Sequence, residues 1–566
     1  MKQFLKYSCL VVLACLSVFT ADGKVFNINV SSTNGELTQY LRNKSKLATR
    51  DDTVKINIGR GEYTINGTVE FKCNVVIRGA GRDASTIILN NGSDKSGFKA
   101  FTDDTFLMFF GALEHPISVD ISDVTFRLKE HKGIWWNETN KSSEKLAVKI
   151  YHANHVDIRR VNSYMSNAVI TNFDLRVCSN VTVTDCIISN YNNTHTGGNL
   201  WMRGDQHNIR VTNNKFYKYG NDEALCVFSN LVNAKGNVRG NATYSDIFIE
   251  DNELHYGYDG KDKDKNLANN TLVTIQAGNK EEGYVTNMRN MHIRNNKFYI
   301  NDECNRCFLV MLNENDHHKG IFFEGNQIVN KDLHSANRYY RQDFDIRDKC
   351  TDQDTIYIIN NSVTNGNSVL NPYNTVGYSF LLLQGGNVAM TDNRIVSTVT
   401  TDPFARKDNG VQLVWCGQDG GTLTMRNNVC KGIKYVATVG AGKGTKYFKL
   451  DAFNNYIAGD TRVYCHQVER LDLNFTGNTL VCDNTNFFLQ EFAKKGTVVF
   501  NNNKVNVSSG DGRFMTHWSD TSTDLMKFDR LEVKNNVFSG VKGEQDMFKK
   551  ITNIKKRIVR NNQISQ

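Results

Sequence analysis

The sequence predicts an all-β fold: a right-handed parallel β-helix, a solenoid of about 16 coils with an N-terminal capping helix. Two observations support this prediction, a phrase that recurs along most of the chain and its spacing. The phrase alternates apolar and polar residues around a central polar pair, as in IRVTNNKFY, MHIRNNKFY and LTMRNNVCK. The second member of the pair is an asparagine at these positions: Asn214, Asn252, Asn296, Asn326, Asn361, Asn393, Asn428, Asn455, Asn478, Asn503, Asn536 and Asn562.

The spacing of the phrase matches a coil of three short strands. From position 124 to position 562 the mean interval is about 31 residues, and the shortest is about 23, little more than three strands and their turns need. An inward-pointing Asn at one corner of each coil can donate its amide to the same residue one coil along, so that no buried polar group is left unpaired. Toward the N-terminus, residues that are apolar fill the same slot: Cys186, Val161, Val124 and Ala80.

The first residues, 1–21, have the layout of a secretory signal peptide. Two lysines precede an apolar stretch from Cys9 to Phe19, and small and polar residues follow it. We therefore expect a secreted, periplasmic or cell-surface protein, with a lipid anchor at Cys15 as the alternative. No later apolar run reaches the roughly 18 residues that a membrane helix needs, so no transmembrane segment is expected.

Residues 22–66 are expected to form the N-terminal cap helix and the first strands, and residues 67–566 the β-helix. NGELTQYLRNKS places apolar residues at helical spacing, and a helix over the open end of a β-helix would protect its edge. The segment KKITNIKKRIVR near the other end is rich in lysine and arginine. Either these charges shield the last strand, or that end contacts a partner subunit in an oligomer.

Net charge and cysteine content argue against a nucleic-acid-binding protein, a disulfide-built scaffold and a structural zinc site. Eight basic residues in the signal peptide and the C-terminal segment account for most of the net charge of +9, so the sequence gives no indication of a nucleic-acid partner. Removal of the signal leaves an odd number of cysteines, sparse for a disulfide-built scaffold. Cys304 and Cys307 form an isolated C-x-x-C without a second pair, and we expect no structural zinc there.

The stretch IRGAGRDASTIIL and the asparagine repeat resemble the β-helix superfamily of pectate lyases, polygalacturonases and related polysaccharide-degrading proteins, over roughly residues 52–566. This superfold also carries epimerases, phage tailspikes and adhesins, so the resemblance is specific for fold and not for reaction. It implies that the strand after each copy of the repeat belongs to the first sheet, whose outer face forms the substrate cleft in such enzymes. Here those strands include KIYHA, VITNFD, NLWMRGD, ALCVFS and LVTIQAG.

An acidic pair, Asp222 and Glu223, opens one of these strands in YKYGNDEALCVFS. The pair is similar to the acidic corner of polygalacturonase-like enzymes, where one carboxylate can protonate the glycosidic oxygen while the other activates water. The family's companion motifs are absent: residues 195–197 read HTG where N-T-D would stand, and neither G-H-G nor R-I-K is found. We therefore expect acid/base or metal-binding groups here, but not a polygalacturonase.

A lyase would need a base for the proton alpha to a uronate carboxylate, and a cation or Ca²⁺ to neutralise that carboxylate. Candidate groups lie on consecutive predicted coils: Lys149, Tyr151, His152, Asp174, Arg203, Asp222 and Glu223. The pectate lyase signatures W-x-D-H and R-x-P-x-x-R are missing, and DGKDKDKN holds only a fragment of a calcium loop. No metal ligands are assigned, and the cofactor stays open, with calcium as the option for a lyase.

Tryptophans are candidates for contact with sugar rings. Trp135 and Trp136 lie in the insertion HKGIWWNETNKS, and alternation along the strand places Trp201 and Arg203 outward. The structural alternative is that these side chains pack a loop onto the rod. His195 and the pair at 317–318 have no partner at a recognised spacing, and we interpret them as surface histidines.

The sequence thus predicts an exported polysaccharide lyase or glycoside hydrolase with a cleft around residues 149–276. The expected catalytic residues are Asp222, Glu223 and Arg203, and the expected substrate-binding residues are Trp201, Trp135, Trp136, Lys149, Tyr151 and Asp174. The alternative is a non-catalytic cell-surface β-helix that binds glycans or partners. Clustering of these groups in one groove favours the enzyme, and burial in private salt bridges favours the binding protein.

Overall fold

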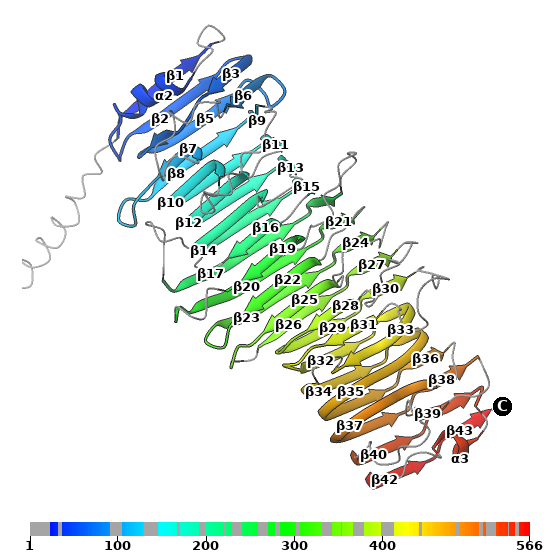
Figure 1. Cartoon of the computed structure of the whole chain (residues 1–566). Helices are drawn as coiled ribbons and strands as arrows, with labels where there is room; N and C mark the ends of the chain where they lie inside the picture. The colour runs from blue at the N-terminus through cyan, green and yellow to red at the C-terminus, as the bar shows by residue number, and fades with distance from the viewer. Residues whose placement is uncertain are drawn as a thin grey trace, which may run out of the picture.

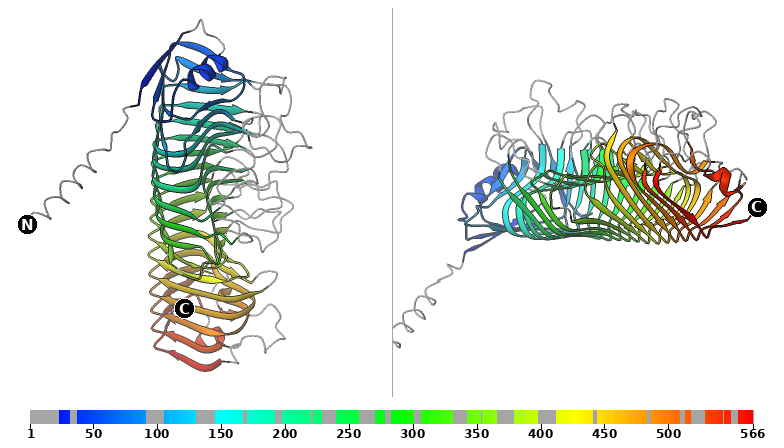
Figure 2. Two further views of the ribbon diagram at one scale, coloured as in Figure 1. Left: turned by 90° about the vertical axis from the view of Figure 1, so that its left-hand side faces the viewer. Right: turned by 90° about the horizontal axis from the view of Figure 1, so that it is seen from below.

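The chain forms a parallel β-helix, in which strands stack coil upon coil into an elongated rod (Figures 1 and 2). Pairings between named strands are parallel throughout, and an isolated antiparallel bridge joins Ala112 and His115. The computed structural model describes residues 23–31, 37–90, 105–129, 145–166, 170–191, 198–219, 222–228, 240–257, 270–277, 283–300, 306–330, 342–352, 354–365, 379–397, 412–440, 444–482, 486–508, 513–516, 528–541, 543–548 and 554–565.

Three ladders of strands run the length of the rod, and we name them the first, second and third sheets. The first sheet contains most of the strands that follow a copy of the repeat. Its members are β4 (Val69–Phe71), β7 (Thr105–Phe110), β16 (Asp222–Phe228), β19 (Asn270–Gln276), β22 (Arg306–Leu312), β25 (Gln342–Asp348), β28 (Ser379–Leu383), β31 (Gln412–Cys416) and β39 (Arg513–Thr516), with parts of the long strands β10 (Lys145–Arg159), β12 (Ile170–Thr184), β14 (Leu200–Thr212), β33 (Val429–Val439), β35 (Tyr456–Thr476) and β37 (Asn486–Asn501).

The second sheet follows the first along each coil, and five of the long strands bend across the corner between them. The other parts of β10, β12, β14, β35 and β37 therefore belong to this sheet. Its remaining members are β1 (Val25–Val30), β2 (Thr53–Ile58), β5 (Asn74–Gly79), β8 (Ile117–Ser122), β17 (Ala242–Glu250), β20 (Thr286–Arg294), β23 (His317–Glu324), β26 (Thr355–Ile359), β29 (Asn387–Thr391), β32 (Gly421–Arg426), β34 (Thr445–Phe453), β40 (Phe528–Lys534) and β42 (Ile554–Arg560).

The third sheet completes each coil with short strands. Its members are β3 (Gly61–Ile65), β6 (Ser85–Leu89), β9 (Thr125–Leu128), β11 (Asn162–Ser166), β13 (Ile187–Tyr191), β15 (Lys215–Tyr219), β18 (Glu253–Tyr256), β21 (Lys297–Ile300), β24 (Gln327–Asn330), β27 (Ser362–Asn365), β30 (Arg394–Ser397), β36 (Thr479–Cys482), β38 (Lys504–Val507), β41 (Val537–Ser539) and β43 (Gln563–Ser565), with the starts of β33 and β35.

The predicted asparagine ladder is confirmed at the corner between the second and third sheets. Each asparagine from Asn214 to Asn536 donates both its backbone N–H and its side-chain Nδ2 to Oδ1 of the next asparagine, over 2.8–3.1 Å. The other Nδ2–H group donates to a backbone carbonyl of the preceding coil. In Asn428, for example, it donates to the carbonyl of Met390 at 2.9 Å. Every polar atom of these buried side chains is therefore satisfied.

Toward the N-terminus the ladder position holds residues other than asparagine. Oδ1 of Asn214 accepts the backbone N–H of Cys186, whose side chain is buried as predicted, as are Val161 and Val124. The prediction for Ala80 is wrong, because that residue is exposed. At that corner the fully buried hydroxyl of Ser85 donates to the carbonyl of Gly59 and accepts the N–H of Ala80, so it takes over the polar role.

The core is continuous along the rod, because buried hydrophobic residues of the described strands form one cluster from Ile28 to Phe548. Near the middle, Phe308 stacks on Phe344 with ring centroids 4.7 Å apart, and Phe344 contacts Phe380 at 5.1 Å. Strands such as β8 alternate buried and partly exposed residues along their length, the period-two pattern of a sheet with one face in the core.

In the described part of the chain, two helices flank the strands. Helix α2 (Thr38–Ser45) lies at the N-terminal end of the rod, with Leu37 and Leu41 buried and Nε of Arg42 donating to the carbonyl of Thr68 at 2.7 Å (Figure 1). Its role as a cap, the domain bounds and the number of coils stay predictions. The short helix α3 (Glu544–Met547) precedes Phe548, which contacts Phe514 of β39. Among the described residues, no helix has the length and apolarity to cross a membrane.

Candidate functional site

The outer face of the first sheet brings five of the predicted site residues together. Strands β10, β12 and β14 lie side by side in register, and their inward residues Ile150, Leu175 and Met202 are fully buried in the core. The outward residues occupy two adjacent rows. One row contains Lys149, Asp174 and Trp201, and the other Tyr151, Arg176 and Arg203; we name these six residues the outer-face cluster.

Asp174 is the centre of this cluster. Its carboxylate is fully buried, and Oδ2 accepts hydrogen bonds from Nε and Nη2 of Arg176 at 2.8 and 2.6 Å. Nε of Arg203 lies 3.7 Å from Oδ1. Burial by itself would raise the pKa of Asp174, but the two guanidinium groups, with a contribution from Lys149, hold that pKa below its usual range. The carboxylate is therefore ionised at neutral pH, and it fixes two arginines on neighbouring strands.

Aromatic rings cover the same rows. The guanidinium carbon of Arg203 lies 4.3 Å from the ring centroid of Trp201, and Nζ of Lys149 lies 6.0 Å from that of Tyr151. Burial raises the pKa of Tyr151, and Arg176 opposes this shift, so Tyr151 is not poised to act as a base at neutral pH. Trp201 was expected to present a stacking surface, but its side chain is only 4% exposed.

The acidic pair lies on the next strand of the sheet. Strand β16 begins at Asp222, and its Leu225 and Cys226 pair with Leu200 and Trp201 of β14. The acidic pair therefore lies on the neighbouring strand, three to four residues before the row that contains Trp201. The side chains of Asp222 and Glu223 lie outside the described residues. So do the predicted positions Trp135 and Trp136 and the segment DGKDKDKN.

Arg176 and a second cluster of the same kind were not among the residues predicted from the sequence. Asp345 is fully buried, accepts hydrogen bonds from Arg347 at 2.8 and 2.9 Å and is bound by Nε of Arg306 at 2.6 Å. It occupies the same row of the first sheet as Asp174, several strands further along. A sequence signal for both exists, because FDLR at 173–176 and FDIR at 344–347 share one pattern.

Histidines give two further groups with metal-binding side chains. Asp120, His155 and Asp157 lie on the outer face of the second sheet, where Nε2 of His155 is 3.1 Å from Asp120 and Arg159 forms an ion pair with Asp157. The other group includes His318, for which the prediction of a surface histidine is wrong. Its side chain is fully buried against Asp348.

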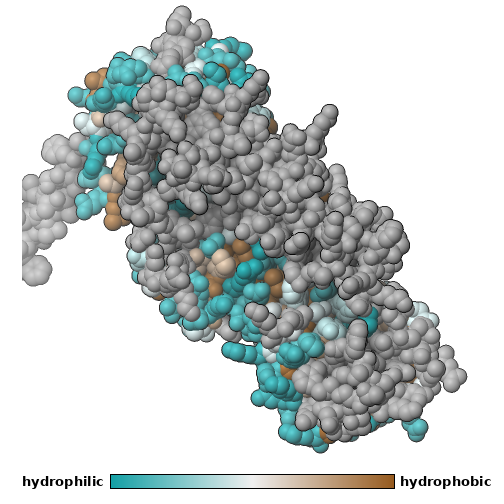
Figure 3. Space-filling model, in the orientation of Figure 1, coloured by the Kyte–Doolittle hydropathy of each residue, from teal (hydrophilic) through white to brown (hydrophobic). Residues whose placement is uncertain are grey.

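The described part of the surface shown in Figure 3 is mostly hydrophilic, with apolar residues in small groups. The outer-face cluster combines charged groups with aromatic rings. Chemically, such an arrangement can neutralise an anionic group and position a ring-shaped ligand, while acid/base chemistry would have to come from the adjacent β16.

Comparisons with known proteins add little beyond the fold. No family model matches the sequence, and no curated protein is similar to it at a significant level. Among solved structures, the catalytic domain of GH87 alpha-1,3-glucanase in complex with nigerose has 9% identity and a TM-score of 0.27, covering 90% of this chain and 68% of that chain. A PL6 family alginate lyase has 11% identity and a TM-score of 0.23, covering 96% of this chain and 100% of that chain. The fold assignment rests on the strand pairing described above.

Proposed function

We propose that this chain is an exported carbohydrate-active enzyme, a polysaccharide lyase or glycoside hydrolase, that acts on a polysaccharide along the outer face of the first sheet. One observation carries the proposal: Lys149, Asp174 and Arg203 lie on three adjacent strands of one face, in two neighbouring rows, and the next strand, β16, begins with the acidic pair. Charged groups on adjacent strands of one face are what substrate positioning and acid/base chemistry require.

Each group has a role in this proposal. Asp222 and Glu223 act as general acid and base, or hold a calcium ion if the enzyme is a lyase. Arg203 neutralises charge on the substrate or transition state, and Lys149, which is partly exposed, binds an acidic group of the sugar. Asp174 is a positioning residue, because it is fully buried and acts through its two arginines. Trp135 and Trp136 are the remaining sugar-binding residues of this proposal, whereas the buried rings of Trp201 and Tyr151 support Arg203 and Lys149.

The test is turnover of a panel of neutral and acidic polysaccharides by the exported chain, with and without a chelator. Ultraviolet absorbance of unsaturated ends reports a lyase, and new reducing ends report a hydrolase. We expect Glu223→Gln and Asp222→Asn to lower kcat by at least about 100-fold, and Lys149→Ala to raise KM. The control is Lys297→Ala, an exposed lysine of the third sheet, which should retain full activity. Full activity of both carboxylate variants would remove the pair from the mechanism.

A non-catalytic glycan-binding protein is the second candidate, and a specific observation favours it. The carboxylate of Asp174 is completely buried in an ion pair with Arg176, the geometry of a structural salt bridge rather than of a reacting group. Binding of a polysaccharide without any turnover across the panel, measured by affinity electrophoresis, would select this candidate. Loss of that binding in Lys149→Ala but not in Lys297→Ala would place the binding surface at the same cluster.

A further inference from the structure

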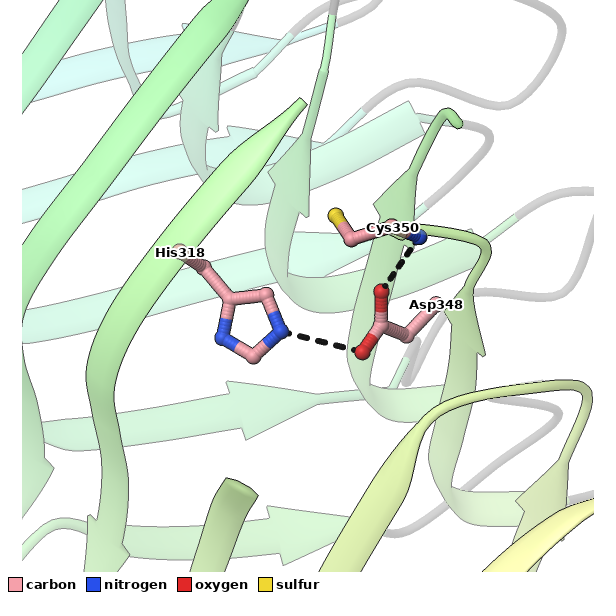
Figure 4. Close-up of side chains that lie close together, drawn as sticks. All are labelled: His318, Asp348 and Cys350. Carbon is pink, nitrogen blue, oxygen red and sulfur yellow. Dashed lines mark hydrogen bonds and ion pairs between the residues drawn. The ribbon is translucent and has the colours of Figure 1, made fainter. Parts of the chain in front are cut away.

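A second group of chemically active side chains lies at the corner between the first and second sheets, away from the outer-face cluster. His318 is the second residue of β23, Asp348 is the last residue of β25, and Cys350 follows two residues later. The three side chains come from two neighbouring coils and point toward one another (Figure 4). The sequence gives no signal for this group, because its members are at no recognised ligand spacing.

The distances are those of a metal site that needs little adjustment. Nε2 of His318 lies 3.0 Å from Oδ2 of Asp348, and one ligand atom from each of the three residues lies within 4.8 Å of the other two. In a tetrahedral zinc site with bonds of about 2.0–2.3 Å, ligand atoms are separated by about 3.3–3.8 Å. Movements of about 1 Å or less therefore bring all three atoms to bonding distance of one ion.

The site is sealed from solvent and already oriented. The side chains of His318 and Asp348 are fully buried, and Cys350 is 1% exposed. The backbone N–H of Cys350 donates to Oδ1 of Asp348 at 3.0 Å, which fixes the carboxylate and directs Oδ2 toward His318. On the next coil stands Gly386, where a Cβ atom would lie 2.4 Å from Oδ2, so this coil leaves space for the carboxylate only because it has no side chain there.

Negative charge is concentrated around the thiol. Burial raises the pKa of Cys350, and Asp348 and the fully buried Asp316 raise it further. Both oxygens of Asp316 accept backbone N–H groups, from Thr286 at 2.8 Å and from Asn313 at 2.7 Å. A bound dication would reverse this effect, because coordination to a metal deprotonates a thiol outright.

We propose that His318, Asp348 and Cys350 bind one divalent transition-metal ion, with zinc(II) as the ion that their chemistry selects. Thiolate and imidazole are ligands for zinc, whereas calcium and magnesium take oxygen ligands only. With the ion bound, Nε2 of His318 is the ligating nitrogen in place of its hydrogen bond to Asp348, and Nδ1, which has no hydrogen-bond partner among the described residues, carries the proton. The ion would join two coils at a corner where no strand hydrogen bonds run between β23 and β25, with a fourth position left for water.

Cobalt(II) is the probe, because a cobalt–thiolate bond gives a charge-transfer band in the near ultraviolet. The full exported chain is made metal-free with a chelator and titrated with cobalt(II). We expect one equivalent to bind, the charge-transfer band to appear with visible bands of four-coordinate intensity, and zinc(II) to displace the cobalt. Cys350→Ser should lose the charge-transfer band. The matched control is Cys430→Ser, because Cys430 is equally buried in the core and should leave the band unchanged.

Two further variants separate ligation from stability. His318→Gln and Asp348→Asn preserve size and hydrogen bonding, and each should weaken cobalt binding by at least about 10-fold. Zinc should raise the thermal midpoint of the wild type and of Cys430→Ser, but not of His318→Gln. If a variant does not fold, the wild type alone decides: zinc should slow alkylation of Cys350, followed by peptide mass spectrometry, at least about 10-fold.

Three results would overturn the proposal. They are the absence of cobalt or zinc binding at stoichiometric concentration, a charge-transfer band that survives in Cys350→Ser, and alkylation of Cys350 at the same rate with and without zinc. Any of them would leave the three side chains as a hydrogen-bonded structural cluster. None depends on the activity of the outer face, so the metal site and the proposed enzyme stand or fall separately.

Discussion

At the scale of single residues, the central polar pair of the repeat combines two different functions. The second member, such as Asn428, builds the ladder, and the first member adopts the left-handed conformation in every coil of the ladder, with φ between +53° and +73°. Asparagine, aspartate and glycine tolerate this conformation best, and they are the residues found there. The ladder could be predicted from the sequence because it repeats. The left-handed conformation of the first member could also have been predicted, because that position holds asparagine, aspartate or glycine in the coils of the ladder. It was not among the predictions made from the sequence.

Replacing one ladder residue should destabilise the chain strongly. Asn428→Ala removes the acceptor of two hydrogen bonds from Asn393 and the donor to Met390, so buried polar groups lose their partners. We expect a loss of about 2–5 kcal/mol in the free energy of unfolding, measured by chemical denaturation. The control is Asn427→Gly, next in the chain but exposed and at φ +54°, where glycine is well tolerated. Equal effects of the two changes would show that the ladder bonds contribute little.

At the scale of strands and corners, alternation predicted that Trp201 and Arg203 face outward, and the structure agrees, because Leu200 and Met202 belong to the core cluster and Trp201 does not. Alternation could not predict how far outward residues are covered, which is why Trp201 and Asp174 are more buried than expected. Side-chain pairs between adjacent strands also could not be predicted from the sequence. Asp345 and Arg306 are hydrogen bonded on adjacent strands although they are far apart in the sequence and are not register partners. The FDLR and FDIR patterns indicate only the pairs within one strand, Asp174 with Arg176 and Asp345 with Arg347.

The corner near Asp348 requires a glycine at position 386, and this requirement can be tested by substitution. Gly386 and Gly283 have almost the same backbone angle, φ +73° and +70°, but a Cβ atom at Gly386 would collide with Asp348, whereas one at Gly283 would meet nothing within 4 Å. Both alanine substitutions carry the cost of the left-handed conformation, and only Gly386→Ala adds the collision. We expect it to be less stable than Gly283→Ala by about 1–3 kcal/mol, measured as the difference between their denaturation midpoints. Equal stabilities of the two variants would mean that the corner accommodates the extra Cβ atom at little cost.

At the scale of the whole molecule, a β-helix is a chain of nearly equivalent layers, each stabilised mainly by the layers above and below it. The order of strands was predictable because every coil repeats the same pattern, and the structure shows parallel pairing from β1 to β43. The site was less predictable, because it depends on segments that depart from the repeat. The acidic pair begins a strand like any other, and its side chains lie outside the described residues.

This layered construction predicts that one complete unit can be removed. Asn455 and Asn478 are 23 residues apart and hydrogen bonded, so deleting residues 456–478 joins Asn455 to Thr479 and preserves the sequence of strands. We expect a folded rod, with protected amide hydrogens at Asn428 and Asn455 by hydrogen exchange. Deleting only residues 456–466 removes about half a coil and should turn inward side chains outward, which abolishes folding. A rod that tolerates both deletions equally would contradict the layered description.

The register between Asp174 and Asp345 has a consequence for any long ligand. The two lie in one row with five strand spacings between them, or about 24 Å at about 4.8 Å per strand. The rod therefore carries two similar clusters of aspartate and arginine whose separation is a whole number of strand spacings. A linear polymer lying along the rod would present the same chemical group to both clusters if its repeat divides this distance a whole number of times. A polymer with any other repeat would present that group to only one of them.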